Sequence, residues 1–572
     1  MVSTRLTQPL RLSMSDREPG KSAPFTPRLS KEQTEALIGG SNLFLKACPG
    51  SGKTRTVAAR VAAELSNDKT LAMLSYTNVG AREVAAAVVI DHSVVLKVED
   101  FVGTVHAFLN KFVLHPFGHL VTRSDVSMSI DPDEAQARMP VGVKSAMFEF
   151  RMDGTIRHTK DKYVSDAQRM AITKAKRKAG REGYVNYSDS IFVCRLVLSR
   201  YPAIAEALAK RFDEIIVDEA QDTSAMQLEC LRLIARAGLK SLVLVGDYDQ
   251  TIYEFIGSSP GGCDGLATEL GLKTVALSEN YRSSQLICDM TARIRGGGPA
   301  DRATGEHASL QVAPKLLLYK EGGERQLVEQ FESIIVAAGI AAESKAILIR
   351  TGAAASKIKG TAIRTPLDSP FKEFIDVGAT ELVTFEQYKS LERVLVKRSF
   401  GRNHGLSLDR SLVRSHVAEF VDDLPELEGD LFTWLAEASR SLDAHAQALS
   451  PATTTPVSTV EPPESSKGVT ADLWVVPENP AIGVDTIHSA KGLSIDAVML
   501  VGMPRMYQWP TDAENWAAGI DAVVGFRPNE ALRVGYVALT RARQLNVLAL
   551  PSDTDEGLIA RYESAGFERT KF

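Results

Sequence analysis

Residues 43–54 read Leu-Phe-Leu-Lys-Ala-Cys-Pro-Gly-Ser-Gly-Lys-Thr. An apolar start, a proline–glycine loop and a Lys-Thr pair predict a short buried strand, a tight loop and the start of a helix that continues to Leu65. Gly50 and Gly52 lack a Cβ atom, so backbone N–H groups of the loop are able to close around phosphate oxygens. This stretch therefore predicts a strand–loop–helix unit that binds phosphate.

The residues that open the helix supply chemistry for a nucleotide. Lys53 brings a positive charge to the β- and γ-phosphates, and the hydroxyl of Thr54 is a ligand for Mg²⁺. The helix also points its positive end at the anion. Ala47, however, stands where the usual phosphate-loop pattern has its first glycine. A glycine turn before an ordinary helix is the alternative interpretation, and the rest of the chain must decide.

The composition sets the class of protein. The chain has 572 residues, 44% hydrophobic and 24% charged, as in a globular protein of about three or four domains. With a net charge of −5, overall charge does not attract nucleic acid, so any such surface must be local. Five cysteines without paired spacing predict a reducing compartment, with neither a disulfide framework nor a zinc site. No apolar run is long enough for a membrane span, and residues 1–28 lack a signal-peptide core, so we expect a cytoplasmic protein with a flexible N-terminal tail.

A second strand end carries two acids. Residues 215–223 read Ile-Ile-Val-Asp-Glu-Ala-Gln-Asp-Thr. We expect Asp218 to hold Mg²⁺ and Glu219 to orient and deprotonate the attacking water, because hydrolysis of a magnesium nucleotide needs both. Two acids at a strand end are ordinary alone, but together with the phosphate loop they predict a hydrolytic site.

Residues 241–250 repeat this design, as a strand followed by Gly-Asp-Tyr-Asp-Gln. Tyr253 and Phe255 follow, and their rings either belong to the core or stack the bases of a single strand. Arg282 comes just after a further strand. Strands and helices alternate along the chain, so we expect a parallel sheet covered on both faces, with ligands at the carboxyl ends of its strands.

One residue near the N-terminus has two interpretations. Residues 29–37 predict a capped helix in which Ser30 is the N-cap and Gln33 its capping-box partner. On the local pattern alone, this structural role is the better interpretation of Gln33.

The region from about 110 to 201 reads as helical, and its charge is uneven. Residues 151–181 hold ten basic residues against three acidic ones. Such a face is either a solvated surface or a patch that follows nucleic-acid phosphates. The basic residues include Lys174, Lys176, Arg177 and Lys178.

The region 361–477 shows few regular signals. Within it, residues 451–467 are rich in Pro, Thr, Ser and Glu, which predicts a disordered linker.

In order, these motifs resemble the UvrD/Rep/PcrA group of superfamily 1A helicases from about residue 29 to 550. The matching pieces are Gln33, residues 47–54, Tyr76-Thr77-Asn78, Gly103-Thr104-x-His106, Asp218-Glu219-x-Gln221-Asp222, Gly246-Asp247-x-Asp249-Gln250, Asn280-Tyr281-Arg282-Ser283, residues 488–493 and Tyr536-x-x-x-Thr540-Arg541-Ala542. The compact form also resembles helicase-like subunits of bacterial anti-phage systems, such as the Gabija B subunit.

The resemblance implies an α/β fold with two RecA-like parallel-sheet domains, largely helical insertions, and ATP with Mg²⁺ in the cleft between the domains. The first domain would comprise residues 29–109 and 202–280, with a DNA-binding helical insertion at 110–201. The second would comprise 281–360 and 478–572, with a reduced insertion at 361–477.

The resemblance also implies roles for single residues. Gln33 would contact the adenine edge, with Tyr281 and Arg55 enclosing the base. Gln250, Arg282 and Arg541 would approach the γ-phosphate, where arginines stabilise developing charge. The residues expected to bind nucleotide are Gln33, Ala47, Cys48, Pro49, Gly50, Ser51, Gly52, Lys53, Thr54, Arg55, Tyr281, Arg282 and Arg541. The expected catalytic residues are Lys53, Glu219, Gln250, Arg282 and Arg541, the metal ligands Thr54 and Asp218, and the nucleic-acid contacts Tyr76, Thr77, Asn78, Thr104, His106, Tyr253, Phe255 and His488.

The implied function is an ATP-dependent 3′-to-5′ DNA helicase that moves along single-stranded DNA, in repair or anti-phage defence. Two positions depart from the family: Ser494 replaces an acid that helps hold the ribose, and Ile256 replaces an arginine after the stacking aromatic. Because the second insertion is short, the alternative is a DNA-sensing ATPase that recruits or regulates a nuclease or repair partner and unwinds little. A free-standing nuclease is disfavoured, and RNA stays open as the polymer.

Overall fold

The structure is a computed structural model that describes most of the chain. The described residues are 29–38, 40–160, 162–250, 261–320, 322–358, 371–378, 383, 385–400, 410–425, 429–449, 462, 482–503, 511–520, 522, 526 and 528–570. The expected N-terminal tail, 1–28, lies outside them, as does the expected linker 451–467 apart from Pro462.

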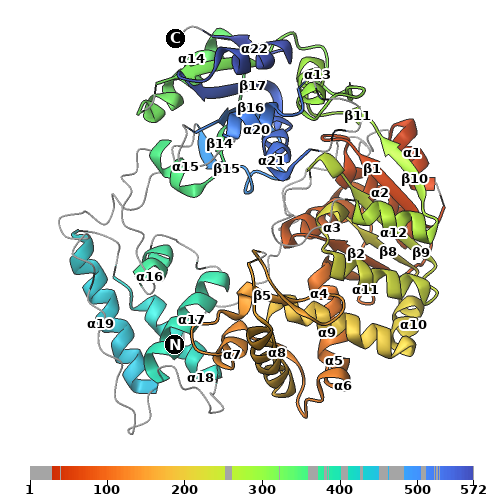
Figure 1. Cartoon of the computed structure of the whole chain (residues 1–572), viewed down its shortest axis with the longest axis vertical. Coiled ribbons are helices and arrows are strands. Elements are labelled where there is room, and N and C mark those ends of the chain that lie inside the picture. Colours follow the sequence, from red (N-terminus) through yellow and green to blue (C-terminus); the bar gives the residue numbers. More distant parts are fainter. Residues whose placement is uncertain are drawn as a thin grey trace, which may run out of the picture.

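The N-terminal half of the chain builds a six-stranded sheet, in the order β10-β1-β9-β8-β2-β3, whose strands are all parallel. Its strands are β1 (Leu43–Ala47), β2 (Leu71–Ser75), β3 (Phe101–Thr104), β8 (Glu214–Val217), β9 (Ser241–Gly246) and β10 (Lys273–Leu277). Its helices are α1 (Lys31–Ile38), α2 (Lys53–Ser66), α3 (Asn78–His92), α10 (Pro202–Arg211), α11 (Ala225–Arg236) and α12 (Gly262–Leu270). We call this sheet with its helices the first sheet unit; it lies at the right in Figure 1.

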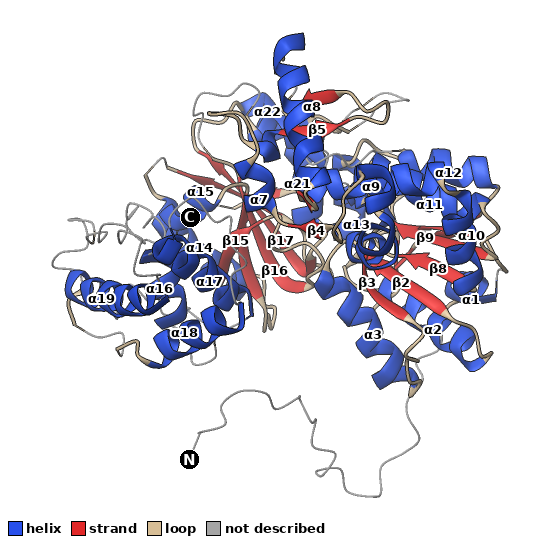
Figure 2. Cartoon of the chain, turned by 90° about the horizontal axis from the view of Figure 1, so that it is seen from below, coloured by secondary structure: helices blue, strands red, loops and turns tan. Residues whose placement is uncertain are grey.

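Helices cover both faces of this sheet, as the strand–helix alternation predicted (Figure 2). Strand β9 shows why: Leu242 and Leu244 pack into one hydrophobic core, while Val243 and Val245 pack into the other. Successive side chains of a strand point to opposite faces, so a continuous apolar run is buried on both sides. The carboxyl ends of all six strands therefore meet at one edge, which carries the polar loops.

An insertion of helices and short strands leaves the first sheet after β3 and returns at α10. Its helices are α4 (Val105–Leu109), a π-helical turn (Asn110–Leu114), α5 (His115–Phe117), α6 (His119–Thr122), α7 (Pro132–Ala137), a 3₁₀ turn (Ser145–Met147), α8 (Asp166–Arg181) and α9 (Tyr187–Arg200). It also contains two small sheets that the helical interpretation of this region missed. These pair β4 (Ser129–Ile130) with β7 (Tyr184–Val185) and β5 (Phe148–Phe150) with β6 (Ile156–His158).

The C-terminal half builds a second six-stranded parallel sheet, in the order β15-β14-β16-β17-β13-β18. Its strands are β13 (Lys315–Tyr319), β14 (Lys345–Ile349), β15 (Gly483–Thr486), β16 (Ile495–Val501), β17 (Ala542–Pro551) and β18 (Glu568–Arg569). Its helices are α13 (Gln285–Ile294), α14 (Leu327–Ala337), α15 (Gly352–Ile358), α20 (Asp512–Ala517), α21 (Glu530–Leu539) and α22 (Glu556–Ser564). A parallel pair, β11 (Glu279–Asn280) and β12 (Arg302–Ala303), lies where the chain passes from the first sheet to this second sheet unit.

Of the five described helices between β14 and β15 in the sequence, the last four form a helical unit at the lower left of Figure 1. They are α16 (Phe371–Gly378), α17 (Phe385–Phe400), α18 (Arg410–Asp422) and α19 (Leu431–Leu449). They share a core that includes Phe374, Leu395, Phe420 and Trp434. The interpretation of 361–477 as a region of few regular signals is therefore wrong for the residues of these four helices.

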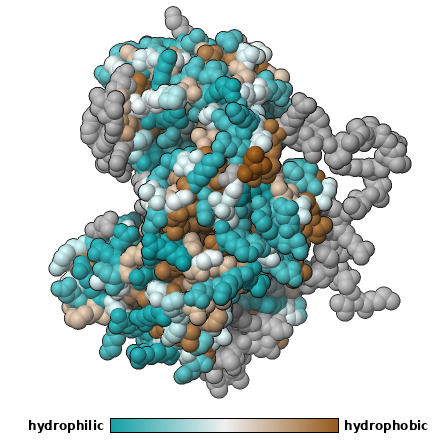
Figure 3. Space-filling view, turned by 90° about the vertical axis from the view of Figure 1, so that its right-hand side faces the viewer, coloured by the Kyte–Doolittle hydropathy of each residue, from teal (hydrophilic) through white to brown (hydrophobic). Residues whose placement is uncertain are grey.

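The surface drawn in Figure 3 is mainly hydrophilic, with its hydrophobic residues in separate groups. Among the described residues, no helix combines the length and the apolar character that crossing a membrane requires. The α/β fold class with two parallel sheets and helical insertions is confirmed.

Candidate active site

The loop between β1 and α2 is shaped to hold an anion. Gly50 and Gly52 adopt φ angles of 72° and 74°, which glycine reaches without strain. Gly52 is the N-cap of α2 and provides no side-chain cap, so the first N–H groups of this 14-residue helix face the loop. The hydroxyl oxygen of Ser51 is buried and has no partner among the described residues. An uncapped helix start beside an unpartnered buried hydroxyl fits a bound phosphate.

The acidic strand end lies directly beside this loop. Strand β8 ends at Val217, and the Nζ atom of Lys53 lies 3.4 Å from Oε1 of Glu219. Glu219 has a φ angle of 51°, which turns the chain sharply after the strand. The predicted closeness of Lys53 and Glu219 is thus present in the structure.

Burial and neighbouring charges shift the pKa values of Asp218 and Glu219 in opposite directions. Burial, helped by the charge of Glu219, raises the pKa of Asp218 to about 7. Burial alone would raise the pKa of Glu219, but the charges of Lys53, Lys491 and Arg541 and the hydrogen bond from Gln221 together outweigh burial and lower this pKa to about 2. Burial alone would lower the pKa of Lys53, but the surrounding carboxylates, Glu219 first, raise it. At neutral pH the pair is therefore a lysine cation and a glutamate anion.

A hydrogen-bonded chain of side chains connects this pair with the next strand. Gln221 donates from Nε2 to Glu219 and accepts from the backbone N–H of Asp247 at 3.1 Å. Gln250 in turn donates from Nε2 to Asp247 at 2.8 Å. A Cβ atom at Gly246 would stand 2.4 Å from Oε1 of Gln221, so this contact requires glycine there. The ends of β8 and β9 are thereby held in one fixed arrangement.

The second sheet unit contributes two arginines to the same place. Nη2 of Arg541, which follows α21, donates to Oε1 of Gln250 at 2.7 Å. Arg282 donates from Nη1 to the carbonyl of Thr540 at 2.9 Å, and its Nε atom is buried without a partner among the described residues. Burial, with the charge of Arg541, holds the pKa of Arg282 well below its usual range. A phosphate group would neutralise the two neighbouring guanidinium charges and accept a hydrogen bond from the unused donor.

The segment before Arg282 packs against the phosphate loop. The N–H of Tyr281 donates to the carbonyl of Gly50 at 2.9 Å. A Cβ atom on Gly50 would stand 2.6 Å from both the Cβ atom of Arg282 and Oδ1 of Asn280, so the loop tolerates only glycine at this contact. The structure thus brings Tyr281 and Arg282 to the loop that the sequence predicted they would serve.

Gln33 contacts both the N-cap residue of its own helix, Ser30, and the phosphate loop. Its Oε1 accepts from the N–H of Ser30 at 3.0 Å, and its own N–H donates to Oγ of Ser30 at 3.2 Å, so the capping box is confirmed. Its Nε2 also donates to the carbonyl of Ser51 in the phosphate loop at 3.0 Å. The contact with adenine stays a prediction, as does the base-enclosing role of Tyr281 and Arg55.

Known proteins with a similar sequence include ATP-dependent DNA helicases. Residues 29–268 match the family model described as the UvrD/REP helicase N-terminal domain. This N-terminal part of the chain therefore belongs to the family of UvrD/REP helicase N-terminal domains. It is similar to the ATP-dependent DNA helicase PcrA of Staphylococcus epidermidis (strain ATCC 35984), with 26% identity over 366 residues, covering 59% of this chain and 50% of that protein. It is also similar to UvrD1 of Mycobacterium leprae (strain TN), with 27% identity over 300 residues, 45% of this chain and 38% of that protein. The chain spans half or less of the length of these relatives.

The resemblance predicted which residues contact nucleic acid. Several of them directly follow β2 and β3, at the carboxyl edge of the first sheet. Ser75 and Thr104 are register partners, so the residues that follow β2 and β3 start side by side. Oγ1 of Thr77 and of Thr104 accepts from the first turns of α3 and α4 as helix caps. Tyr76 is half-buried and Asn78 is exposed. These positions agree with a binding edge, although both threonines also have this structural task.

His106 lies on α4 of the insertion, whereas His488 lies in the second sheet unit. Nε2 of His106 lies 3.0 Å from Oγ of Ser190, and burial lowers the pKa of His106 to about 4, so the ring is neutral at neutral pH. His488 is half-buried and follows β15. Their contacts with nucleic acid stay predictions. Tyr253, Phe255 and the departure at Ile256 lie outside the described residues.

The basic patch on α8 is smaller than the sequence suggested. Lys176 is buried, and its Nζ atom pairs with Asp189 at 2.6 Å. This lysine therefore stabilises the packing of α8 against α9 and presents no charge to a polymer. Lys174, Arg177 and Lys178 are exposed.

Two further residues, Lys491 and Asn280, hold the candidate site together, although sequence reasoning gave them no role. Lys491 donates to Asp222 and, at 3.2 Å, to the carbonyl of Gln250, so it joins the second sheet unit to the first. Asn280 accepts from the N–H groups of Arg282 and Ser283 at 2.8 and 2.9 Å, which fixes the turn that carries Arg282. An Asn often accepts from the backbone N–H two residues further along and so forms a turn, which means that Asn280 was a signal for this turn in the sequence.

Proposed function

We propose that this chain hydrolyses ATP and uses the hydrolysis to move 3′ to 5′ along single-stranded DNA, separating the strands of a duplex. The observation that carries the proposal is the hydrogen bond from Arg541 of the second sheet unit to Gln250 of the first. Through it, both units contribute groups to one phosphate site. The relatives PcrA and UvrD1 carry the name ATP-dependent DNA helicase, which supports the same activity here.

The ion pair in the site suggests how Glu219 becomes available. In the structure, Lys53 pairs with Glu219 at 3.4 Å. A γ-phosphate competes for the lysine, and the carboxylate is then free to orient a water molecule and accept its proton. The role of Gln250 is to position groups around the phosphate, because it is already held between Asp247 and Arg541.

The hydroxyl of Thr54 and the carboxylate of Asp218 are oxygen donors of the kind that Mg²⁺ prefers, and the ion would neutralise phosphate charge at this place. The second sheet unit supplies the two arginines of the site. Arg282 and Arg541 stabilise the charge that develops on the transferred phosphoryl group.

Movement follows from the division of the site. Because the groups that contact the phosphates come from two units, the state of the nucleotide decides how firmly the units close on each other. In this proposal Tyr76 of the first sheet unit, His106 of the insertion that follows β3 and His488 of the second sheet unit hold the strand, so closing and opening moves it.

A strand-displacement assay tests the proposal. Duplexes with a 3′ or a 5′ single-stranded tail are incubated with the full chain, with and without ATP, and ATP turnover is measured with and without single-stranded DNA. The proposal predicts ATP-dependent unwinding of the 3′-tailed duplex and DNA-stimulated turnover. Absence of unwinding of either duplex contradicts it.

A second function is favoured by the size of the helical unit. Among the described residues this unit contains four helices, of 8, 16, 13 and 19 residues, and we expect so small an insertion to separate duplex strands poorly. A DNA-sensing ATPase that recruits or regulates a nuclease, as in anti-phage defence, predicts strongly DNA-stimulated turnover with little unwinding and a protein that co-purifies. The same turnover assay with single-stranded RNA decides between the polymers. A role in repair and the cytoplasmic location also stay predictions.

A further inference from the structure

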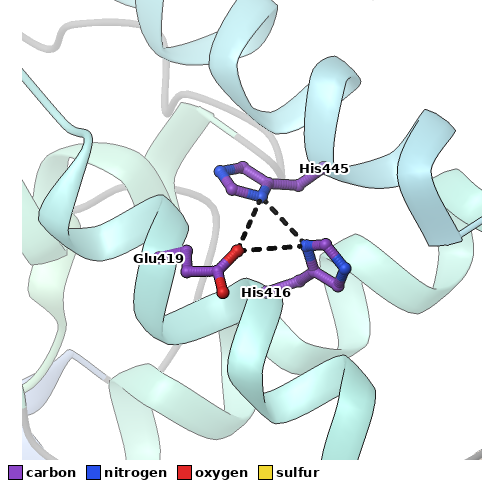
Figure 4. A group of neighbouring side chains, drawn as sticks. All are labelled: His416, Glu419 and His445. Carbon is purple, nitrogen blue, oxygen red and sulfur yellow. Dashed lines mark hydrogen bonds and ion pairs between the residues drawn. The ribbon is translucent and has the colours of Figure 1, made fainter.

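The helical unit contains a cluster of metal-ligating side chains that the nucleotide site does not use. His416 and Glu419 lie on α18, and His445 lies on α19. A separation of three residues places His416 and Glu419 on one face of α18, and the packing of α19 against α18 brings His445 to them (Figure 4). The two histidine side chains are only 18% and 12% exposed.

The three nearest atoms form a triangle that fits one ion. Nδ1 of His416 lies 3.2 Å from Nδ1 of His445, and Oε2 of Glu419 lies 3.5 and 4.0 Å from these two nitrogens. The point equidistant from three atoms so separated is about 2.1 Å from each, which is the distance at which zinc binds histidine nitrogen and carboxylate oxygen. All three ligand atoms therefore lie within binding distance of one point.

A fourth side chain favours the tautomer that a metal needs. Nε2 of His445 lies 3.4 Å from Oδ2 of Asp423, just past the end of α18. A carboxylate at this position keeps the proton on Nε2 and leaves Nδ1 free as a ligand. A plain hydrogen bond between the histidines then requires the proton on Nδ1 of His416, so the tautomer of His416 distinguishes the hydrogen-bonded pair from the metal-binding form.

We propose that His416, Glu419 and His445 bind one divalent transition-metal ion, with zinc as the ion to test, and that the ion fastens α18 to α19. Two imidazoles and a carboxylate suit zinc and its first-row neighbours, whereas Mg²⁺ and Ca²⁺ prefer oxygen ligands alone. The sequence argument against a zinc site considered only the cysteines, and this site uses none.

The test uses the full chain after treatment with a chelator. Zinc per chain is measured after gel filtration, and Co²⁺ is added separately so that its visible absorption reports the ligand geometry. We expect about one equivalent of zinc, an intense visible cobalt band typical of low coordination number, and a thermal midpoint at least ~5 °C higher with saturating zinc. ATP turnover is expected to stay unchanged, because none of these residues belongs to the nucleotide site.

Variants place the ion at this cluster. His416→Gln and His445→Gln should each lose the equivalent of zinc and the cobalt band, Glu419→Gln should bind more weakly, and Asp423→Asn should bind about 10- to 100-fold more weakly. His119→Gln, an exposed histidine in the other insertion, is the matched control and should bind like the wild type. Equal zinc binding by His445→Gln and wild type, or no binding by a folded wild-type chain, would show that the cluster is a hydrogen-bonded histidine pair only and overturn the proposal.

Discussion

A buried ion pair behind the phosphate loop gives the most quantitative prediction. Arg60 of α2 is 3% exposed and Glu214, the first residue of β8, is 1% exposed. The guanidinium donates to both carboxylate oxygens, at 2.9 and 2.7 Å. It also donates to backbone carbonyls at the end of α1, among them that of Gly40 at 2.8 Å. The pair thus joins the helix that starts with Lys53 to the strand that ends beside Glu219.

Replacing Arg60 with Leu leaves Glu214 buried without its partner. Breaking a buried pair in this way costs about 3–5 kcal/mol, because an uncompensated charge stays inside. For a unit of roughly this size, each kcal/mol corresponds to about 2–4 °C, so the first unfolding transition should fall by about 6–20 °C. Differential scanning calorimetry of the full chain measures this shift directly.

A neighbouring surface pair provides the control. Lys240 bridges to Asp213 at 2.6 Å, next to Glu214 in the sequence, but its side chain is 72% exposed. Lys240→Ala should therefore cost no more than about 1 kcal/mol. The double variant Arg60→Leu/Glu214→Leu should recover part of the loss, since it removes both charges. If Arg60→Leu unfolds within about 1 kcal/mol of the Lys240 control, our account of this pair is wrong.

Further predictions concern the phosphate loop and its neighbours. Lys53→Ala should abolish ATP turnover mainly by weakening phosphate binding, which fluorescence titration with a labelled nucleotide detects; unchanged affinity would refute this. Glu219→Gln should keep nucleotide binding and slow hydrolysis by about 10²–10⁴-fold, measured as phosphate release, and near-normal release would show that the base is a different residue. Gly50→Ala should destabilise the fold more than Gly238→Ala does in thermal melts, because both positions have positive φ but only the Cβ at Gly50 would overlap Arg282; equal losses would contradict the packing argument.

The sequence predicted the site wherever its groups are contiguous. The phosphate loop and the acidic strand end are local patterns that reflect one backbone geometry each, and both are present where expected. No local pattern indicates that Arg541 reaches Gln250, 291 residues away; only the resemblance to a family implied this contact.

Other features depend on packing between distant elements. Arg60 and Glu214 meet only because α2 covers β8, and His416 and His445 only because α18 packs on α19. The helices themselves could have been found: Leu431, Leu435 and Leu442 recur at helical spacing along α19 and are fully buried or nearly so.

The central claim is that one hydrolytic site is divided between two sheet units. Its most direct test is ATP turnover by Arg541→Ala and Arg541→Lys, with labelled-nucleotide affinity and a thermal melt to show that each variant is folded. Our account predicts that turnover falls by about 10³-fold or more in both variants, while the affinity changes far less. Folded variants that hydrolyse ATP at close to the wild-type rate would contradict it.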